Sequence, residues 1–247
     1  MKAILWAGLG AGRKVTEQAL VSLSPYLDIQ VVKDPKHFKQ PNWEKEIDVI
    51  IFGGGRASGF VESLTLNCTD YEPLLRIKNF VYEGGKYIGL CAGAYFASTR
   101  IEFEQGTKEG IATEMTLGLS NTVARGAVYK GYSKESENSL IVGVDMINDI
   151  GCDHLESYYY GGSEFILNTN ADQSQFKILA TYSNFESPKT AMLITSFGKG
   201  LVFQSGIHPE VYEHFEPDKT NLLRQADFNR SLVFNYLNAT FLHSQLQ

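Results

Sequence analysis

KYIGLCAGAYFA, at residues 86–97, is the stretch that decides the fold. Residues 86–90 form a short apolar run typical of a buried strand, and the small side chains that follow Cys91 favour a tightly packed helix. The pattern Gly89-Leu90-Cys91-Ala92-Gly93 has the form of a sharp strand-to-helix turn with a nucleophile at its centre. Because neither glycine has a side chain, Cys91 can hold an unusual backbone conformation with its sulfur exposed.

Cys91 is therefore a candidate nucleophile. The start of the following helix supplies free N–H groups and a positive dipole end, which favour a thiolate and make the Ala92 N–H a candidate oxyanion donor. The alternative is an ordinary buried thiol, since free cysteine is among the most buried residue types. The position of Cys91 between a strand and a helix favours the nucleophile.

The first half of the chain alternates strands with helices. Strands are expected at residues 2–7, 28–32 and 48–52, and a helix is expected at residues 13–26. The spacing Thr69-Asp70-Tyr71-Glu72 predicts a capping box at the start of a further helix. Such alternation indicates a mostly parallel sheet with helices on both faces, a three-layer α/β sandwich in which ligands bind at the carboxyl ends of the strands.

The second half is less regular. Residues 102–162 read as turns and short strands, and strands are expected again at 176–182, 190–197 and 200–204, the last two as a hairpin. Apolar residues from Leu222 to about Phe241 recur at helical spacing and predict a helix that covers one face of the sheet. Without a linker or repeat, residues 1–247 are expected to form one domain.

A histidine and a glutamate follow the last of these strands, in Gly206-Ile207-His208-Pro209-Glu210. His208 is expected at the same sheet edge as Cys91. Pro209 keeps His208 extended, so Glu210, two residues on, points the same way and can orient the imidazole. Nucleophile, base and orienting carboxylate are then Cys91, His208 and Glu210. The alternative for His208 is a surface histidine before a helix that opens at Val211.

Two further segments are candidates for substrate contacts. Gly53-Gly54-Gly55-Arg56 follows the third strand, where successive glycines let N–H groups converge on an anion; the alternative is a plain flexible turn. Arg56 can pair with a substrate carboxylate. Tyr158-Tyr159-Tyr160-Gly161-Gly162 can form an aromatic wall with a backbone platform beside the site, for which a strand ending in a turn is the alternative. Tyr95 is a further candidate for substrate binding, with Tyr160 and Gly161.

Composition excludes several functions. With 22 basic and 28 acidic residues, the net charge of −6 and the lack of a basic cluster argue against nucleic-acid binding. No apolar run approaches membrane-spanning length and no signal peptide is evident, so we expect a cytoplasmic protein.

The cysteines, Cys68, Cys91 and Cys152, are too few and too scattered for a disulfide framework or a zinc site. His154 lies near Cys152, but two ligands do not make a metal site. We expect no metal, no cofactor and a small-molecule ligand, and the sequence identifies no partner protein.

These motifs resemble a known family. Phe52-Gly53-Gly54-Gly55, the turn around Cys91 and His208-Pro209-Glu210 occur in the order and at the separation of class I glutamine amidotransferase-like domains. Cys91-Ala92-Gly93-Ala94-Tyr95 and the later Tyr160-Gly161-Gly162 look like the amidotransferase-like domain at the N-terminus of biotin-protein ligases. The resemblance runs from Lys2 to about Glu210.

The resemblance implies a flavodoxin-like sandwich and a Cys91, His208 and Glu210 triad. It does not imply glutaminase activity, because typical members carry a glutamine soon after the nucleophile, where this chain has Ala94-Tyr95-Phe96. The ligase catalytic region is missing and the chain ends soon after Glu210, so we do not expect biotinylation by this chain.

Two functions follow as hypotheses: an amidase or hydrolase of a small amide or peptide-like substrate that works through a thioester, and a binding or regulatory module without turnover. A redox or glyoxalase-like protein shares the cysteine turn, but usually places an acidic residue near the cysteine and lacks this His-Pro-Glu segment.

Overall fold

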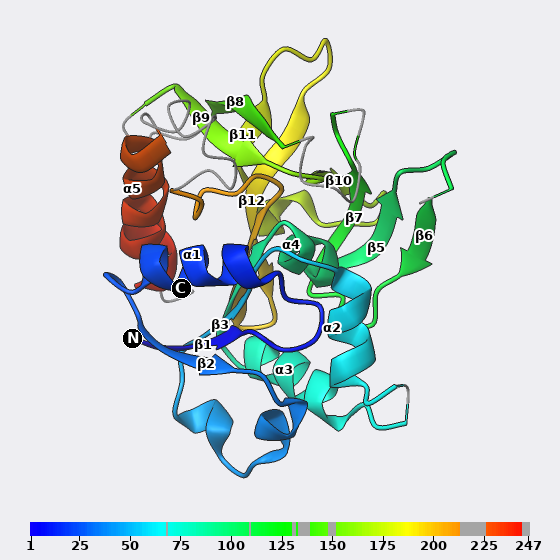
Figure 1. Ribbon diagram of the computed structural model, residues 1–247, viewed down its shortest axis with the longest axis vertical. Helices are drawn as coiled ribbons and strands as arrows, with labels where there is room; N and C mark the ends of the chain where they lie inside the picture. Colours follow the sequence, from blue (N-terminus) through cyan, green and yellow to red (C-terminus); the bar gives the residue numbers. More distant parts are fainter. Residues whose placement is uncertain are drawn as a thin grey trace.

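The computed structural model describes residues 1–67, 69–108, 110–129, 132, 139–147, 152–212 and 226–243, and only the backbone of residues 226–230. In this part of the chain, the strands form a nine-stranded sheet and a four-stranded sheet. Figure 1 shows the two sheets side by side, with helices on both faces of the larger one.

The larger sheet is parallel in its first half and antiparallel in its second. The parallel strands, in spatial order, are β2 (Asp28–Val32), β1 (Lys2–Trp6), β3 (Val49–Phe52), β4 (Lys86–Leu90) and β13 (Gly200–Ser205). The antiparallel strands continue from β13 as β12 (Lys189–Phe197), β11 (Phe176–Tyr182), β8 (Leu140–Met146) and β9 (His154–Tyr159). The parallel half positions the site, because two of its strands end beside one another there.

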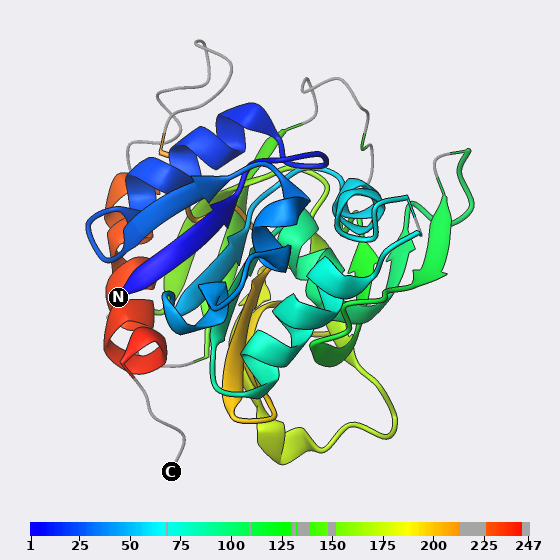
Figure 2. The ribbon, with the colours of Figure 1, turned by 90° about the horizontal axis from the view of Figure 1, so that it is seen from below.

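The smaller sheet follows directly from the helix after Cys91. Its strands lie in the order β10 (Ser163–Leu167), β7 (Ser120–Gly126), β5 (Ser98–Phe103) and β6 (Ile111–Glu114). Figure 2 shows β6 at the outer edge of this sheet. Strand β5 begins where helix α4 (Ala92–Ala97) ends, so the chain passes from the cysteine turn straight into the second sheet.

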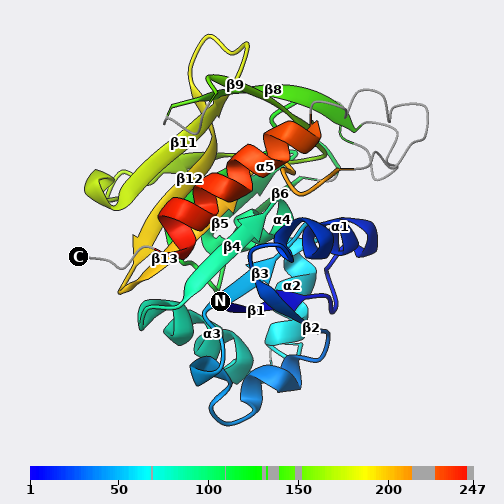
Figure 3. The same cartoon turned by 90° about the vertical axis from the view of Figure 1, so that its left-hand side faces the viewer.

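Helices cover both faces of the larger sheet. One face packs against α1 (Arg13–Leu23) and α5 (Ala226–Leu237), and the other against α2 (Ala57–Leu64), α3 (Glu72–Tyr82) and α4. Figure 3 shows α5 lying along the sheet. Short helical segments complete the description at Pro35–Lys39, Trp43–Lys45, Gln173–Gln175 and Asn238–Leu242. No helix of the described residues is long and apolar enough to cross a membrane.

Strand alternation explains why both faces are covered. In β1, Ala3 and Leu5 belong to the core cluster under α1 and α5, whereas Ile4 and Trp6 belong to the cluster on the opposite face. All four side chains are at most 1% exposed. A strand that is apolar on both faces has to lie between two layers, which is what its continuous apolar sequence predicts.

The three-layer α/β fold, the parallel strands and the hairpin of β12 and β13 are confirmed. The sheet as a whole is mixed rather than mostly parallel, because β12, β11, β8 and β9 extend it in antiparallel pairing. Leu222 lies outside the described residues, and the helix predicted there is described from Ala226.

The capping box predicted at Thr69 is wrong. Thr69 donates its hydroxyl to the Leu66 carbonyl, and the Asp70 carboxylate accepts the N–H of Glu72, where α3 begins. The Asp70 carboxylate, two residues before the helix, therefore accepts the free N–H that the sequence pattern predicted to bond to the Thr69 hydroxyl.

Substitution of Phe52 tests the packing of the sheet against helices α2 and α4. Its ring lies 5.1 Å from the ring of Phe60 and 5.2 Å from that of Phe96, between centroids, and is fully buried. We expect Phe52→Ala to lower the free energy of unfolding by about 3–5 kcal/mol, measured by urea denaturation. Leu75→Ala, at an α3 position that is 51% exposed, should change it by less than about 0.5 kcal/mol. Equal effects of the two substitutions would contradict this packing.

Candidate functional site

Cys91 occupies the junction between β4 and α4. Its backbone has φ 49° and ψ −105°, in a region that residues other than glycine rarely adopt, and its N–H donates to the carbonyl of Ser205 across 2.8 Å. The hydrogen bond ties the cysteine to the end of the neighbouring strand β13. Backbone strain held in place by surrounding structure is a feature of functional sites.

The glycines on either side of Cys91 allow this turn. A Cβ on Gly93 would overlap the backbone of Phe52, and one on Gly89 would come within 2.7 Å of the Gly93 carbonyl oxygen. The Gly93 N–H also donates to the carbonyl of Gly53 across 3.1 Å. The turn and the loop after β3 are thus packed backbone against backbone, as the glycine pattern predicts.

His208 faces Cys91 because β4 and β13 end level with one another. Leu90 pairs with Ser205 in the parallel register, and the Ser205 hydroxyl donates to the Ile207 carbonyl at the following turn. The His208 N–H donates to the Tyr158 carbonyl of β9 across 2.9 Å. With 2% exposure, His208 is not the surface histidine that the sequence left open. Both His208 and Cys91 line the same cavity, which is described below.

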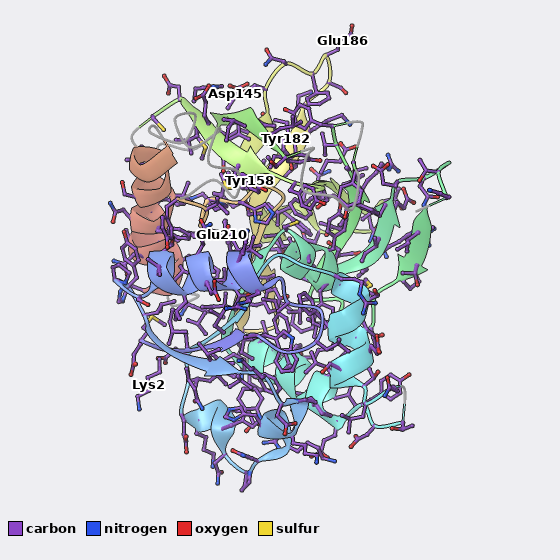
Figure 4. The ribbon with its side chains drawn as sticks, in the orientation of Figure 1. Lys2, Asp145, Tyr158, Tyr182, Glu186 and Glu210 are labelled. Carbon is purple, nitrogen blue, oxygen red and sulfur yellow. The ribbon has the colours of Figure 1, made fainter. Side chains whose placement is uncertain are left out.

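Glu210 lies behind His208, fully buried. Its Oε1 is 2.7 Å from the Nδ1 of His208, and its Oε2 has no hydrogen-bond partner among the described residues. Ser22 of α1 donates its hydroxyl to the backbone carbonyl of Glu210 across 2.7 Å. Figure 4 shows Glu210 and Tyr158 in the region between α1 and β9.

The charge of Glu210 decides the protonation of His208. Burial alone lowers the pKa of the imidazole, but the negative charges of Glu210 and Cys91 and the hydrogen bonds to both outweigh it and raise the pKa to about 10. At neutral pH the imidazolium is therefore the favoured form. A carboxylate bonded to Nδ1 also leaves the other ring nitrogen to face the reacting groups.

Three backbone N–H groups near Cys91 have no acceptor among the described residues: those of Ala92, Gly54 and Gly55. The Arg56 N–H, by contrast, donates to the Gly10 carbonyl. Gly53 does not line the cavity described below, and its carbonyl serves Gly93. Of the predicted oxyanion donors, Ala92 and Gly55 border the cavity, and Gly54 lies against the His208 ring.

A cavity of about 800 Å³ opens from Cys91 and His208. Tyr95, Tyr160, Gly161 and Arg56 are among its lining residues. The Tyr95 hydroxyl donates to the Gly161 carbonyl across 3.0 Å, and the Cys91 thiol donates to the Tyr160 carbonyl with 3.6 Å between Sγ and O. The tyrosines therefore fix the backbone beside the sulfur as well as forming a wall.

Arg56 is placed at the rim. Its guanidinium contacts the Ser58 hydroxyl at 3.0 Å and Glu62 at 3.4 Å, and its side chain is 60% exposed.

His154 lies apart from the cavity lining and pairs with Asp145 at 2.8 Å. Among the described residues, no three His, Cys, Asp or Glu side chains are placed to share a metal ion.

Sequence reasoning missed the residues that hold the histidine segment. Gln18 accepts the N–H of Tyr212 at 2.8 Å and Ser22 binds the carbonyl of Glu210, both from the buried side of α1. These two polar residues lie four apart on a helix face that also buries Ala19 and Leu23. Polar residues that fall within the apolar stripe of a helix indicate a buried hydrogen-bonding role, and this pattern could have identified Gln18 and Ser22 from the sequence.

The chain is similar to known proteins over most of its length. The family model described as "Biotin-protein ligase, N terminal" matches residues 1–242. The biotin-protein ligase of Schizosaccharomyces pombe is 29% identical over 220 residues, which cover 85% of this chain and 33% of the ligase. An uncharacterized protein of Chlamydia muridarum is 27% identical over 177 residues, 71% of this chain and 65% of that protein. The chain thus spans about a third of the ligase and under two thirds of the chlamydial protein.

A solved structure shares the fold. A glutamine amidotransferase from Thermotoga maritima superposes with a TM-score of 0.56 at 12% sequence identity, covering 99% of each chain. At this identity the likeness concerns the fold alone.

Gly54 and Gly53 form a matched pair for testing the position of His208. A Cβ on Gly54 would come within 2.7 Å of the His208 Cε1, whereas a Cβ on Gly53 would meet nothing within 4 Å. We expect Gly54→Ala to displace the imidazole and shift its ring resonances in a ¹H–¹³C NMR spectrum, and Gly53→Ala to leave them in place. Identical spectra for the two variants would contradict the packing of the ring on Gly54.

Glu210→Gln should change the titration of His208. Without the carboxylate charge, burial dominates, and the pKa of the imidazole should fall from about 10 toward or below its ordinary value of 6.5. Because the folded pKa is raised, its contribution to stability is full below pH 6.5 and is lost as the pH rises through about 10. The difference in unfolding free energy between wild type and Glu210→Gln should therefore shrink from pH 6.5 to pH 10. An unchanged NMR titration of His208 would refute the role of Glu210.

Proposed function

This chain belongs to the family of biotin-protein ligase N-terminal domains, and we propose that it is a cysteine-dependent amidase or hydrolase that cleaves a small amide through a thioester on Cys91. One observation carries this proposal: Cys91 and His208 line the same cavity, and Glu210 holds the Nδ1 of His208 at 2.7 Å from behind. This is the arrangement that nucleophilic acyl transfer requires, a nucleophile within reach of a base that a third group orients.

Acylation begins with the Cys91 sulfur. In this mechanism the sulfur attacks as a thiolate with the His208 imidazolium beside it, and the C=O bond of the amide opens to an oxyanion. In the proposal, the N–H groups of Ala92 and Gly55, two residues that line the cavity, receive this oxyanion. The imidazolium gives its proton to the amide nitrogen, the C–N bond breaks, and the amine or ammonia leaves a thioester on Cys91.

Hydrolysis of the thioester restores the site. A water molecule attacks the thioester carbon and passes a proton to the now neutral His208. The tetrahedral adduct collapses with cleavage of the C–S bond, which releases a carboxylic acid and returns the Cys91 thiolate beside the imidazolium. Glu210 keeps the ring oriented through both steps, since it holds Nδ1 at 2.7 Å.

The ligase relative does not extend the proposal to biotinylation. Only a third of that protein aligns with this chain, and the activity in its name is not part of the function proposed here. Tyr95 lies where typical glutamine amidotransferases are expected to carry a pocket glutamine, so glutamine is not the proposed substrate. A small-molecule ligand and a cytoplasmic location stay predictions from the sequence.

Ammonia or amine release from a panel of amides tests this function. We expect Cys91→Ser to lower turnover by about 10³-fold or more, because the hydroxyl is a much weaker nucleophile. Cys152→Ser, at a half-buried cysteine outside the cavity, should keep wild-type turnover. Turnover that survives in Cys91→Ser would refute the mechanism. Amides that raise the melting temperature of the wild type without any product would instead identify a binding module.

A further inference from the structure

The cavity beyond Cys91 is walled by the second sheet. Strands β5 and β6 and the residue that follows them contribute side chains that are mostly apolar: Ile101, Phe103, Ile111, Thr113 and Met115. Ile101 and Met115 are buried in the core, whereas Ile111 is 46% exposed at the edge strand β6. The end of the cavity that lies away from His208 is therefore apolar.

An aromatic surface connects this apolar end to the reacting sulfur. The Tyr132 ring lies 5.2 Å from that of Tyr160 and 5.0 Å from that of Phe103, between centroids, and Phe103 in turn lies 5.9 Å from Tyr95. The carbonyl of the same Tyr160 accepts the Cys91 thiol. A group attached to a carbonyl at Cys91 would therefore run along aromatic rings toward β5 and β6.

Basic side chains border the cavity beside Cys91. Arg13, Lys14 and Arg56 border the cavity, and no aspartate or glutamate is among its described lining residues. Glu210 lies behind His208 and does not reach the cavity. Arg13 pairs with Glu17 at 3.0 Å and Arg56 with Glu62 at 3.4 Å, and neither glutamate is part of the lining. An ammonium group on a ligand would meet no carboxylate among the described lining residues, and leaving it unpaired in a largely apolar site is unfavourable.

We propose that this cavity selects amides whose acyl portion carries an apolar chain or ring and no positive charge. That these ligands are cleaved rests on the function proposed above, whereas their binding does not. A volume of about 800 Å³ falls within the range of sites for drug-sized ligands and leaves room for a substituted ring. The ammonium group of glutamine matches neither the apolar wall nor the basic side chains of the lining.

Binding of product acids to a Cys91→Ala variant tests the ligand class without turnover. We expect 4-phenylbutyrate to bind at least about tenfold more tightly than 4-[4-(aminomethyl)phenyl]butyrate, which adds one positive charge to the same ring, and than L-glutamate, by isothermal titration calorimetry. Equal affinities, or tighter binding of either ligand that carries an ammonium group, would overturn the proposal.

Ile111 and Val31 provide matched substitutions in the same Cys91→Ala background. Both are β-branched, lie on edge strands and are 46% and 41% exposed, but only Ile111 lines the cavity. Ile111→Asp should weaken 4-phenylbutyrate binding by about tenfold and strengthen binding of the aminomethyl analogue, whereas Val31→Asp should change neither. Circular dichroism would verify that both variants are folded. The same effect from both substitutions would refute the assignment of the wall.

Turnover by the wild type separates this inference from the proposed function. If 4-phenylbutyrate binds as expected but no amide is hydrolysed, the ligand class stands and the amidase function fails. If ammonia is released from glutamine faster than from 4-phenylbutanamide, the amidase function stands and the ligand class is overturned.

Discussion

The parallel pairing of β4 with β13 is the constraint on which the rest of the site depends. The register places Leu90 beside Ser205, so both strands end at the same level. The Cys91 N–H donates the last hydrogen bond between the two strands, to the Ser205 carbonyl. Cys91 and His208, far apart in the sequence, follow these two ends within three residues. A slip of this register by one residue would turn the side chains of one strand to the other face and separate the pair.

His208 shows how packing and electrostatics combine at this point. Its burial works against the charged imidazole, and the buried Glu210 reverses that effect because its carboxylate contacts Nδ1. A buried ion pair adds little net stability but is costly to break, since one charge is then left without its partner. Two polar residues of α1 hold the segment that carries this pair. Ser22 donates its hydroxyl to the Glu210 carbonyl, and Gln18 accepts the N–H of Tyr212. The site therefore draws on three layers of the fold.

Much of this could be predicted from the sequence because the signals are local. Close backbone contacts require the glycines around Cys91, Gly93 against Phe52 and Gly89 against Gly93, and the His-Pro-Glu segment needs only an extended backbone to align its side chains. The antiparallel extension and the second sheet could not be predicted, because strand order depends on partners that a single strand does not encode. The apolar cavity wall was missed for the same reason: Ile101 and Ile111 look like ordinary strand residues until β5 and β6 are placed beside the cysteine.

The relative reactivity of the cysteines tests the central claim, that Cys91 is an activated nucleophile, most directly. Wild-type protein would be treated with iodoacetamide at pH 7, and the modification of Cys91, Cys68 and Cys152 would be followed over time by peptide mass spectrometry. Although Cys91 is only 7% exposed, the account predicts that it reacts at least about tenfold faster than the other two, because it lies at the strand-to-helix turn in a cavity that it shares with His208. Modification of Cys91 at the same rate as Cys152, or more slowly, would contradict it.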